Sequence, residues 1–412
     1  MTREMKNSGI PWIGEIPEGW KVMPHKRVMR KVKEIQEHYN GENILSLTMR
    51  GVIVRDLDAG GKMPTTFDGY QKVYPNNLLQ CLFDIDVTPR CVGLIRDEGL
   101  TSPAYSQFAM YSNGYAPYYD YLLRYMDDGK TLLHLSKNLR SSLTETDFGA
   151  IDTCVPPLAE QQRIAEFLDR KCAEVDEMIA LQEQIIEELK AYKQSVITEA
   201  VTKGLNPAAP MRDSGIEWIG SIPEHWEVCK LKRKYCLLNG RAYSDNELLA
   251  EGKYRILRVG NLFTSNKWYY SDLELEDNKY CSKGDLLYGW SASIGPYLWE
   301  EDKVIYHYHI WKVLYAPNNR RYAFYQLQAL TDAKKMDMHG SAMQHLTMDN
   351  MNNSYIASAP IEEQQAIADY LDEKCADIDS LIQTKQSKID SLKEYKKSII
   401  YEYVTGKREV NE

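Results

Sequence analysis

Two stretches of the chain carry apolar residues that advance alternately by four and three positions. The first stretch holds Val175, Ile179, Gln182, Ile186, Leu189, Lys193 and Val196, with Gln182 and Lys193 as polar interruptions. The second holds Ile378, Ile382, Lys385, Ile389, Leu392, Lys396 and Ile399, interrupted at the matching positions. This spacing is a heptad seam, and it predicts one amphipathic helix in each stretch.

The flanking residues indicate that both helices are long. Pro157 and Pro360 precede them, acidic residues follow in the first turn, and no Gly or Pro interrupts them before Gly204 or Gly406. A helix from Ala159 to Thr202 would measure roughly 65 Å at about 1.5 Å per residue, which is longer than a compact domain needs. A single core helix of a bundle is the alternative interpretation. The length favours two helices packed on each other as a rigid spacer.

The helices belong to an internal repeat with a period near 205 residues, far longer than the period of a solenoid. SGIPWIGEIPEGW at Ser8–Trp20 returns as SGIEWIGSIPEHW at Ser214–Trp226, 206 positions later. PLAEQQRIAEFLDRKCAEVDEMI at Pro157–Ile179 returns as PIEEQQAIADYLDEKCADIDSLI at Pro360–Ile382, 203 positions later. Between these blocks, about 130 residues in each half show no visible match. The chain is therefore a duplicated pair of similar units with different variable regions.

We predict an α/β (α+β) protein with two globular heads of mixed sheet and helices. Two long, antiparallel, coiled-coil-like helices separate the heads, and an internal pseudo-twofold axis relates the halves. The predicted boundaries are residues 1–155 for the first head, 156–203 for the first spacer helix, 204–359 for the second head and 360–412 for the second spacer helix. The prolines and small residues of Gly204–Gly215 are typical of a connection into the second head.

Composition excludes several classes of protein. The chain has 412 residues, 43% hydrophobic and 26% charged, which is near the average of globular proteins. No apolar stretch approaches the roughly 18 residues of a membrane span, and the N-terminus lacks the apolar core of a secretory signal. The eight cysteines include no C-x-x-C pair. We therefore expect a reduced, cytoplasmic protein without disulfides, zinc site or membrane contact.

The net charge of -9 argues against a nucleic-acid partner until its distribution is considered. The stretches 160–203 and 362–407 carry net charges of -4 and -3, so the remaining regions are close to neutral. Those regions contain two basic clusters at matching places, although such a charge run is often only a solvated surface. The clusters are His25, Lys26, Arg27, Arg30, Lys31 and Lys33, and Lys230, Lys232, Arg233 and Lys234. Of the 29 tyrosines, 24 lie outside the helices, which favours a recognition surface without naming its partner.

The repeated blocks resemble those of the specificity subunit of type I DNA restriction-modification systems. The resemblance covers the whole chain and includes SGIPWIGEIPEGW with its copy, PLAEQQRIAEFLDRK, TEAVTKGLNP and PIEEQQAIADYLDEK. It implies a non-catalytic subunit whose two target-recognition domains each bind one half of a split sequence in double-stranded DNA. It also implies that the helices dock methyltransferase (modification) subunits and that a nuclease/translocase subunit joins the complex. The methyl donor and ATP then belong to the partners, so we expect no cofactor in this chain.

Candidate DNA-binding residues follow from the basic clusters and from segments that resemble those of the family. SPAY at Ser102–Tyr105 is one such segment, although an ordinary core turn is the alternative. RVGNL at Arg258–Leu262, GDLLYGWSASIG at Gly284–Gly295 and HGSAMQHL at His339–Leu346 are others. Hydroxyl, amide and guanidinium groups in such loops suit base edges or phosphates, although Asn261 also fits a turn. The candidates are Lys26, Arg27, Arg50, Lys62, Ser102, Tyr105, Lys137 and Arg140 in the first head, and Lys232, Arg233, Arg258, Asn261, Ser291, Ser293 and Gln344 in the second.

The negative charge of the helices suggests docking of a basic partner. Our candidate docking residues are Glu187, Glu188 and Asp390. A coiled-coil scaffold with two tyrosine-rich, protein-binding heads is the alternative function.

Catalytic signatures are missing from the sequence. We find no G-x-G-x-x-G, no G-x-x-x-x-G-K-[ST] and no H-E-x-x-H, and VPPL at Val155–Leu158 lacks the polar and aromatic residues of the adenine-methyltransferase motif. His307 and His309 would share one face of a strand, but a metal site needs a third ligand. We therefore expect a binding protein and not an enzyme.

Overall fold

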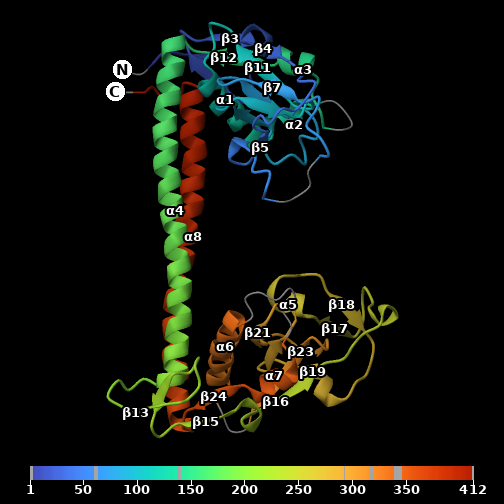
Figure 1. Ribbon diagram of the computed structural model, residues 1–412, viewed down its shortest axis with the longest axis vertical. Helices are drawn as coiled ribbons and strands as arrows, with labels where there is room; N and C mark the ends of the chain where they lie inside the picture. Colours follow the sequence, from blue (N-terminus) through green and yellow to red (C-terminus); the bar gives the residue numbers. More distant parts are fainter. Residues whose placement is uncertain are drawn as a thin grey trace. The chain divides into compact units, whose positions relative to one another are not determined.

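The computed structural model describes residues 3–59, 64–136, 141–291, 293–315, 319–337 and 346–410. The chain divides into two compact units. Unit 1 consists of Met1–Gln182 with Ser387–Glu412, and unit 2 is the continuous stretch Glu183–Gln386. Each unit combines one head with parts of two long helices, α4 (Leu158–Lys203) and α8 (Ile361–Val404) (Figure 1).

The long helices confirm the predicted coiled-coil architecture. Helix α4 begins one residue before Ala159 and ends one residue after Thr202, the range expected from the sequence. Within unit 1, the start of α4 packs against the end of α8, and the rings of Phe167 and Tyr403 lie 4.3 Å apart. Within unit 2, the end of α4 packs against the start of α8 through Val201 and Ile367. The helices are thus antiparallel in each unit, and every apolar seam residue is buried or half-buried.

Two polar interruptions of the seam form ion pairs between the helices. In unit 2 the Lys193 ammonium lies 2.6 Å from the Asp379 carboxylate, and in unit 1 Lys396 lies 2.6 Å from Asp176. Both lysines and both aspartates are 203 positions apart, so the pairs are equivalent under the repeat. A polar residue within a seam fixes the register of the two helices, because any shift would separate it from its partner. Among the described helices, none combines the length and apolarity that crossing a membrane requires.

The head of unit 1 contains short strands and helices around a four-stranded antiparallel sheet. Its strands are β1 (Met5–Asn7), β2 (Glu15–Pro17), β3 (Lys21–Pro24), β4 (Met29–Val32), β5 (Leu45–Thr48), β6 (Gly51–Val54), β7 (Gln71–Val73), β8 (Leu78–Gln80), β9 (Val92–Leu94), β10 (Gly99–Thr101), β11 (Ser106–Met110) and β12 (Asp152–Val155). Its helices are η1 (His25–Arg27), α1 (Ala116–Asp128), α2 (Thr131–Leu135) and α3 (Glu145–Ala150). The central sheet has the order β4-β11-β8-β9.

The head of unit 2 repeats this plan with additional pairing. Its strands are β13 (Met211–Asp213), β14 (Ser221–Pro223), β15 (Glu227–Lys230), β16 (Tyr235–Asn239), β17 (Tyr254–Leu257), β18 (Tyr269–Ser271), β19 (Tyr280–Cys281), β20 (Leu286–Gly289), β21 (Gly295–Leu298), β22 (Val304–Tyr306), β23 (Ile310–Tyr315) and β24 (Tyr355–Ser358). Its helices are η2 (Leu231–Arg233), η3 (Asp245–Glu247), α5 (Val259–Phe263), η4 (Asp277–Lys279), α6 (Arg320–Asp337) and α7 (Met348–Asn353). A second sheet, β18-β17-β22-β19, accompanies the central one.

The two central sheets have the same topology. The order β16-β23-β20-β21 in unit 2 corresponds strand by strand to β4-β11-β8-β9 in unit 1. The last strand of each head also pairs in the same way, β12 with β3 and β24 with β15. Matching threonines, Thr144 and Thr347, accept hydrogen bonds from backbone amides at the starts of α3 and α7. The halves therefore share a fold even where their sequences show no visible match.

Each head is fixed to its helices by a repeated tryptophan contact. The Trp20 indole Nε1 donates a hydrogen bond of 3.0 Å to Glu160, and Trp226 donates one of 3.1 Å to Glu363. Each indole also lies beside a glycine that follows a long helix: Gly406 beside Trp20 and Gly204 beside Trp226, with φ of +71° and +73°. A left-handed residue suits the end of a helix, and a side chain there would strain the backbone and crowd the indole.

His25 does not belong to the basic surface that the sequence suggested. Its side chain is fully buried, packs on Phe148 and has Nδ1 3.2 Å from the Phe148 carbonyl oxygen. Burial lowers the pKa of His25 to about 4, because a charged imidazolium would lose its hydration. His25 is therefore a neutral core residue at neutral pH.

Candidate nucleic-acid interface

In unit 2, strand pairing brings separate loops to one edge of the head. Strand β17 pairs in parallel with β22, with Leu257 opposite Tyr306. Parallel strands end at the same edge of a sheet, so the residues that follow them become neighbours. The His307 backbone N–H donates to the Leu257 carbonyl at 2.9 Å. The stretch that begins at Arg258 therefore lies beside the turn between β22 and β23.

The hairpin of β20 and β21 adds a third loop to this edge. Gly289 pairs with Gly295 across the hairpin and with Ile310 of β23. The loop that follows Gly289 therefore meets the β22–β23 turn, where the Trp290 N–H donates to the His309 carbonyl at 3.2 Å. A Cβ atom at position 289 would lie only 2.8 Å from the Ser293 carbonyl oxygen. Glycine permits this close approach of the backbone.

The three loops enclose a hollow of about 390 Å³, which we call the loop-edge hollow. It is lined by Arg258, Val259, Gly260, Asn261, Thr264, Ser265, Lys267, Ser291, Ser293, His307 and His309. Four of the predicted DNA-binding residues, from sequence positions up to 35 apart, thus line one cavity. The structure adds Lys267, His307 and His309, which the sequence did not place in a DNA site.

The loop-edge hollow has a positive and polar lining. Arg258 and Lys267 both lie over the ring of Tyr269, at 5.5 Å and 5.2 Å from its centroid. No aspartate or glutamate lines the cavity, and within the described residues no carboxylate forms an ion pair with either cation. Such a surface attracts anions, because no neighbouring carboxylate neutralises the two charges.

The two histidines of the hollow are close to each other, with ring centroids 4.8 Å apart. The pKa of His307 is lowered to about 4, first by burial and then by the charges of His309 and Arg258. The His309 backbone N–H lies 3.4 Å from Nδ1 of His307, which makes Nδ1 the acceptor and leaves the proton on Nε2. Across the described residues, no group of three or more His, Cys, Asp or Glu side chains could hold a metal ion.

Asn261 lies in the hollow but has local hydrogen bonds. Its side-chain oxygen accepts from the Arg258 N–H at 3.0 Å, and its amide nitrogen donates to the Lys267 carbonyl at 2.9 Å. These bonds hold the start of the loop against its end. Asn261 thus determines where Arg258 and Lys267 lie.

In unit 1, the candidates Ser102 and Tyr105 form the turn between β10 and β11, the position that His307 and His309 occupy in unit 2. The buried Gln71 amide donates to both of their carbonyl oxygens, at 2.9 Å and 2.8 Å. The half-buried Tyr105 ring stacks with Phe83 from the β8–β9 loop, at 6.1 Å between centroids. Burial raises the pKa of the Tyr105 hydroxyl.

The other candidates of unit 1 are distributed differently. Arg50 is exposed in the tight turn between β5 and β6, and its N–H donates to the Thr48 hydroxyl at 3.2 Å. Four candidates lie outside the described residues, namely Lys62, Lys137, Arg140 and, in unit 2, Gln344.

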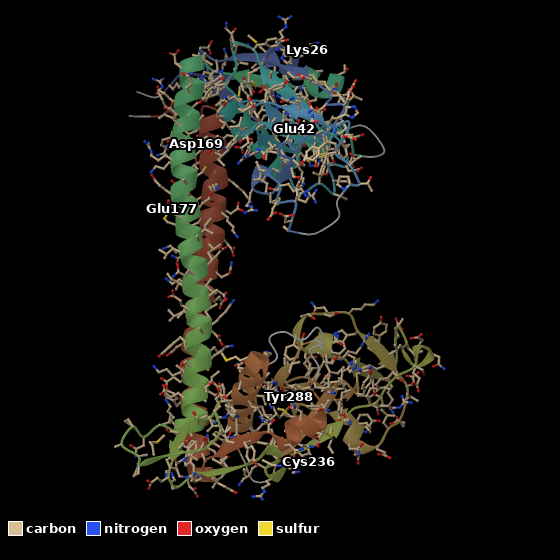
Figure 2. The ribbon with its side chains drawn as sticks, viewed as in Figure 1. Lys26, Glu42, Asp169, Glu177, Cys236 and Tyr288 are labelled. Carbon is tan, nitrogen blue, oxygen red and sulfur yellow. The ribbon has the colours of Figure 1, made fainter. Side chains whose placement is uncertain are left out.

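The basic clusters of η1 and η2 lie away from these loops. Lys26 and Arg27 are in η1, before β4, and Lys26 lies at the margin of unit 1 (Figure 2). Lys232 and Arg233 are in η2, before β16, and the Lys232 ammonium donates to Asn353 at 3.1 Å. Arg241 follows the other end of β16, and its backbone forms an isolated parallel β-bridge with the backbone of His307. The clusters and the loop-edge hollow are therefore at opposite ends of this strand.

The candidate docking residues on the helices are exposed. Glu187 pairs with Lys190 at 2.8 Å along α4, and Glu188 accepts a hydrogen bond of 2.8 Å from Gln184. Asp390 is exposed on α8. Apolar side chains are exposed on the same helices at positions 203 apart: Met178 and Leu381, and Tyr192 and Tyr395.

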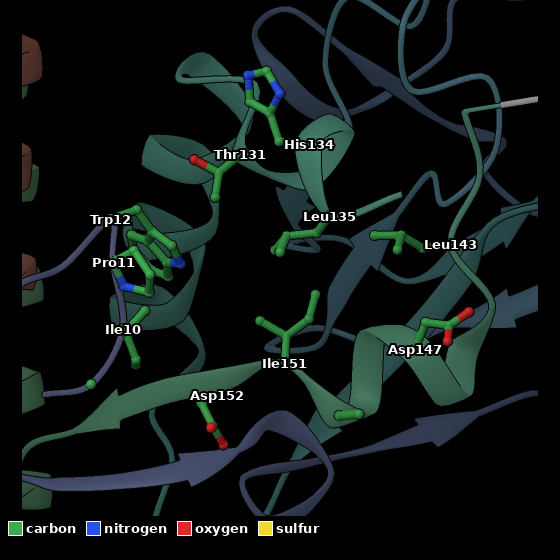
Figure 3. Close-up of a pocket in the computed structure, with 12 residues that line it drawn as sticks. Ile10, Pro11, Trp12, Thr131, His134, Leu135, Leu143, Asp147, Ile151 and Asp152 are labelled. Atoms are coloured by element: carbon green, nitrogen blue, oxygen red, sulfur yellow. The ribbon is translucent and has the colours of Figure 1, made fainter. Parts of the chain in front are cut away.

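Unit 1 has a further cavity of about 580 Å³ with an apolar wall (Figure 3). Trp12 and Pro11 of the repeated first block form one side, and Leu135, Leu143 and Ile151 project into it. Of the candidate DNA-binding residues that the structure describes, none lines this cavity.

Comparison with solved structures defines the fold class. A chain from a study of complex assembly and conformational transition of the type I R-M system superposes with a TM-score of 0.73, at 15% identity, over 94% of this chain and 98% of that chain. The crystal structure of the HsdS subunit from Thermoanaerobacter tengcongensis superposes with a TM-score of 0.53, at 16% identity, over 95% and 98%. At this identity the likeness establishes the fold alone, which is that of HsdS subunits.

Sequence comparison indicates the family. Residues 223–394 match the family described as type I restriction modification DNA specificity domain. The chain is 26% identical to the type I restriction enzyme MjaVIII specificity subunit of Methanocaldococcus jannaschii over 278 residues, 63% of each chain. It is 52% identical to the EcoBI specificity subunit of Escherichia coli over 198 residues, 47% of this chain and 42% of that protein. The chain thus spans less than two thirds of these relatives. The resemblance to type I specificity subunits that the repeated blocks indicate is confirmed.

Proposed function

We propose that this chain is the DNA-recognition subunit of a type I restriction-modification complex. Each head binds one half of an asymmetric, bipartite target in double-stranded DNA. The target-recognition domains are residues 1–155 and 204–359, and the spacer helices are 156–203 and 360–412. One observation carries the proposal: two central sheets of identical strand order present chemically different loops, as expected of two readers of different half-sites.

Catalysis belongs to the partners in this proposal. The chain supplies no nucleotide-binding or methyl-donor motif, so methyltransferase subunits transfer the methyl group and a restriction/translocase subunit uses ATP. The complex acts on DNA in the cytoplasm. Along the helices, Glu187, Glu188 and Asp390 supply negative charge for docking the methyltransferase subunits. The repeated exposed pairs Met178 and Leu381, and Tyr192 and Tyr395, support two equivalent docking surfaces.

The direct test is methylation by the assembled complex. The chain is co-expressed with the methyltransferase subunits of its own system, and methylated positions in the host DNA are mapped by sequencing. We expect one bipartite motif with an unread gap, present only when the chain is present. Methylation that is independent of the chain, or a motif without a gap, would contradict the proposal.

The role of the helices in setting the gap has a separate test. Inserting seven residues after Glu187 and after Asp390 keeps the heptad in phase and lengthens the helix pair by roughly 10 Å. The gap should then grow by about three base pairs at about 3.4 Å each. Those base pairs also rotate the second half-site by about 100° around the DNA axis. Weak activity at the longer gap would therefore still agree with the proposal. Full activity at the original gap would exclude the helices as the spacer.

A further inference from the structure

The two heads place equivalent loops at equivalent strand ends. In unit 2 these loops follow β17, β20 and β22, and in unit 1 they follow β5, β8 and β10. The correspondence rests on the shared order of the central sheets and on matching parallel bridges, Ile256 to Ile305 in unit 2 and Ile44 to Leu100 in unit 1. The same edge of the same scaffold therefore carries the sequence that differs between the heads, which is where a difference in specificity has to originate.

The loop-edge hollow of unit 2 has the two kinds of group that DNA recognition needs. Arg258 and Lys267 are exposed cations at its rim, suited to phosphate oxygens. His307 and Ser293 are half-buried, uncharged and polar, suited to hydrogen bonds with base edges. Charge at the rim and neutral polar groups inside correspond to the division between contacts that position DNA and contacts that read it.

We propose that the loop-edge hollow is the reading site of unit 2, in which His307 and Ser293 determine the base preference while Arg258 and Lys267 bind the phosphate backbone. This proposal rests on the proposed function. It assigns His307 a role in recognition in place of the metal site considered from the sequence, and it makes Lys267 a phosphate contact that the sequence did not suggest.

The chemistry of His307 narrows what it can recognise. Its Nδ1 accepts the His309 N–H, so the neutral ring has Nε2–H as its donor. A donor of this kind matches an acceptor in the major groove, such as N7 or O6 of guanine, N7 of adenine or O4 of thymine. The turn itself is well supported, because the Trp290 indole donates to the Tyr308 carbonyl at 2.8 Å.

The experiment uses the complete complex with its methyltransferase subunits and a library in which every position of the bipartite target is randomised. His307→Phe keeps a ring of similar size and removes the hydrogen bond, and Ser293→Ala removes a hydroxyl group. We expect either variant to reduce discrimination at one or two base pairs of a single half-site by roughly 5- to 150-fold, with the other half-site unchanged. Melting curves of both variants provide the check on folding.

The proposed contact with the phosphate backbone is tested with Lys267→Gln, and Lys253→Gln is the matched control. Lys253 is exposed directly before the first residue of β17, at the end of the strand away from the hollow, and it pairs with Glu274. Lys267→Gln should weaken binding of all sequences alike and reduce the slope of log affinity against log salt by about one, and Lys253→Gln should leave both unchanged.

The outcomes separate the two proposals. If the wild-type complex recognises no bipartite sequence, the proposed function fails. If it does, and folded His307→Phe and Ser293→Ala both retain full discrimination, the loop-edge hollow is not the reading site. A change in both half-sites from one of these variants would also overturn the assignment, because the hollow belongs to unit 2 alone.

Discussion

The two heads share a central sheet and differ at the edge where its loops emerge. In unit 2 that edge is a polar hollow with two cations and two histidines. In unit 1 the equivalent loops expose large apolar side chains, with Met49, Phe83 and Val87 at 61%, 37% and 73% exposure, beside the exposed charges of Arg50, Asp84 and Asp86. Polar groups recognise donors and acceptors on bases, and apolar groups recognise thymine methyl groups or separate stacked bases. The comparison teaches that one scaffold can carry loops of different chemistry, because the residues that pack its core are not the residues that form its loops.

The largest expected effect comes from exchanging one head. Replacing residues 21–150 with the corresponding region of a relative should substitute one half of the methylated motif and preserve the other half and the gap. The reason is that each head has its own core and its own loops. Motif mapping by sequencing is the measurement. A simultaneous change in both half-sites would mean that the heads do not read independently.

The second prediction concerns the stability of unit 1 against pH. His25 and Leu231 occupy equivalent buried positions, so only unit 1 has a titratable group there. The pKa of His25 is about 4 in the folded protein against 6.5 unfolded, so between these values the unfolded state binds more protons. The contribution of neutral His25 to the free energy of unfolding is therefore fully present above pH 6.5. It is lost as the pH drops toward 4, which lowers the free energy of unfolding by as much as about 3 kcal/mol.

The variant His25→Leu places the unit 2 residue, the equivalent of Leu231, in unit 1. It should remove the part of the pH dependence of stability that comes from His25. Denaturant unfolding of the full chain at pH 7.5 and pH 4.5, compared between wild type and variant, measures it. Both proteins will lose stability in acid through their carboxylates, so the difference between them is the relevant quantity. An equal loss in the two proteins would show that His25 titrates normally in the folded state.

A smaller effect is expected from the apolar edge of unit 1. Phe83→Ser retains the loop and removes the exposed ring that stacks on Tyr105. It should reduce discrimination at one position of the half-site that His307→Phe leaves intact, by about 1 kcal/mol. The randomised-target assay reports both variants. If the two variants affect the same half-site, the assignment of one edge to each half-site is wrong.

The smallest effects test the symmetry of the helices. Lys193→Gln and Lys396→Gln each break one of the two equivalent ion pairs, whose lysines are 24% and 29% exposed. Partly exposed pairs contribute about 0.2 to 1 kcal/mol, so each variant should lose a similar, small amount of unfolding free energy. A large loss from only one variant would mean that the helix pair is not equivalent in the two units.

The sequence predicted the repeated parts of the molecule well. A heptad spacing reports directly on burial, and duplication doubled the signal. The expected range Ala159–Thr202 therefore matches α4 to within one residue at each end, whereas α8 ends at Val404, before the predicted boundary at residue 412. The class of fold followed from the same blocks. In these segments, the positions that the heptad pattern requires to be apolar are the same positions that packing between the helices buries. The pattern alone is therefore enough to predict the helices.

The lining of the loop-edge hollow could be predicted only in part. Arg258, Ser291 and Ser293 were selected because their segments resemble those of the family and because their side chains suit DNA. Nothing local indicates that β17 and β22 pair in parallel and thereby bring His307 to the same cavity. Non-local strand pairing depends on the whole head and leaves little trace in sequence spacing. His25 was misjudged for a related reason: a histidine among lysines looks exposed until the partner that buries it, Phe148, is known.

The order in which the chain is synthesised has a consequence for its folding. Unit 2 is one continuous stretch, whereas unit 1 needs Ser387–Glu412 as well as its first 182 residues. In the finished unit 1, the Tyr118 hydroxyl donates to the Val404 carbonyl at 2.7 Å, and the Lys407 ammonium donates to the Ile13 carbonyl at 2.9 Å. Every residue of unit 2 is therefore synthesised before Ser387–Glu412, the segment that completes the core of unit 1. We therefore expect that the N-terminal-first order usual for domains cannot apply to the complete unit 1, because its last segment is made after the whole of unit 2.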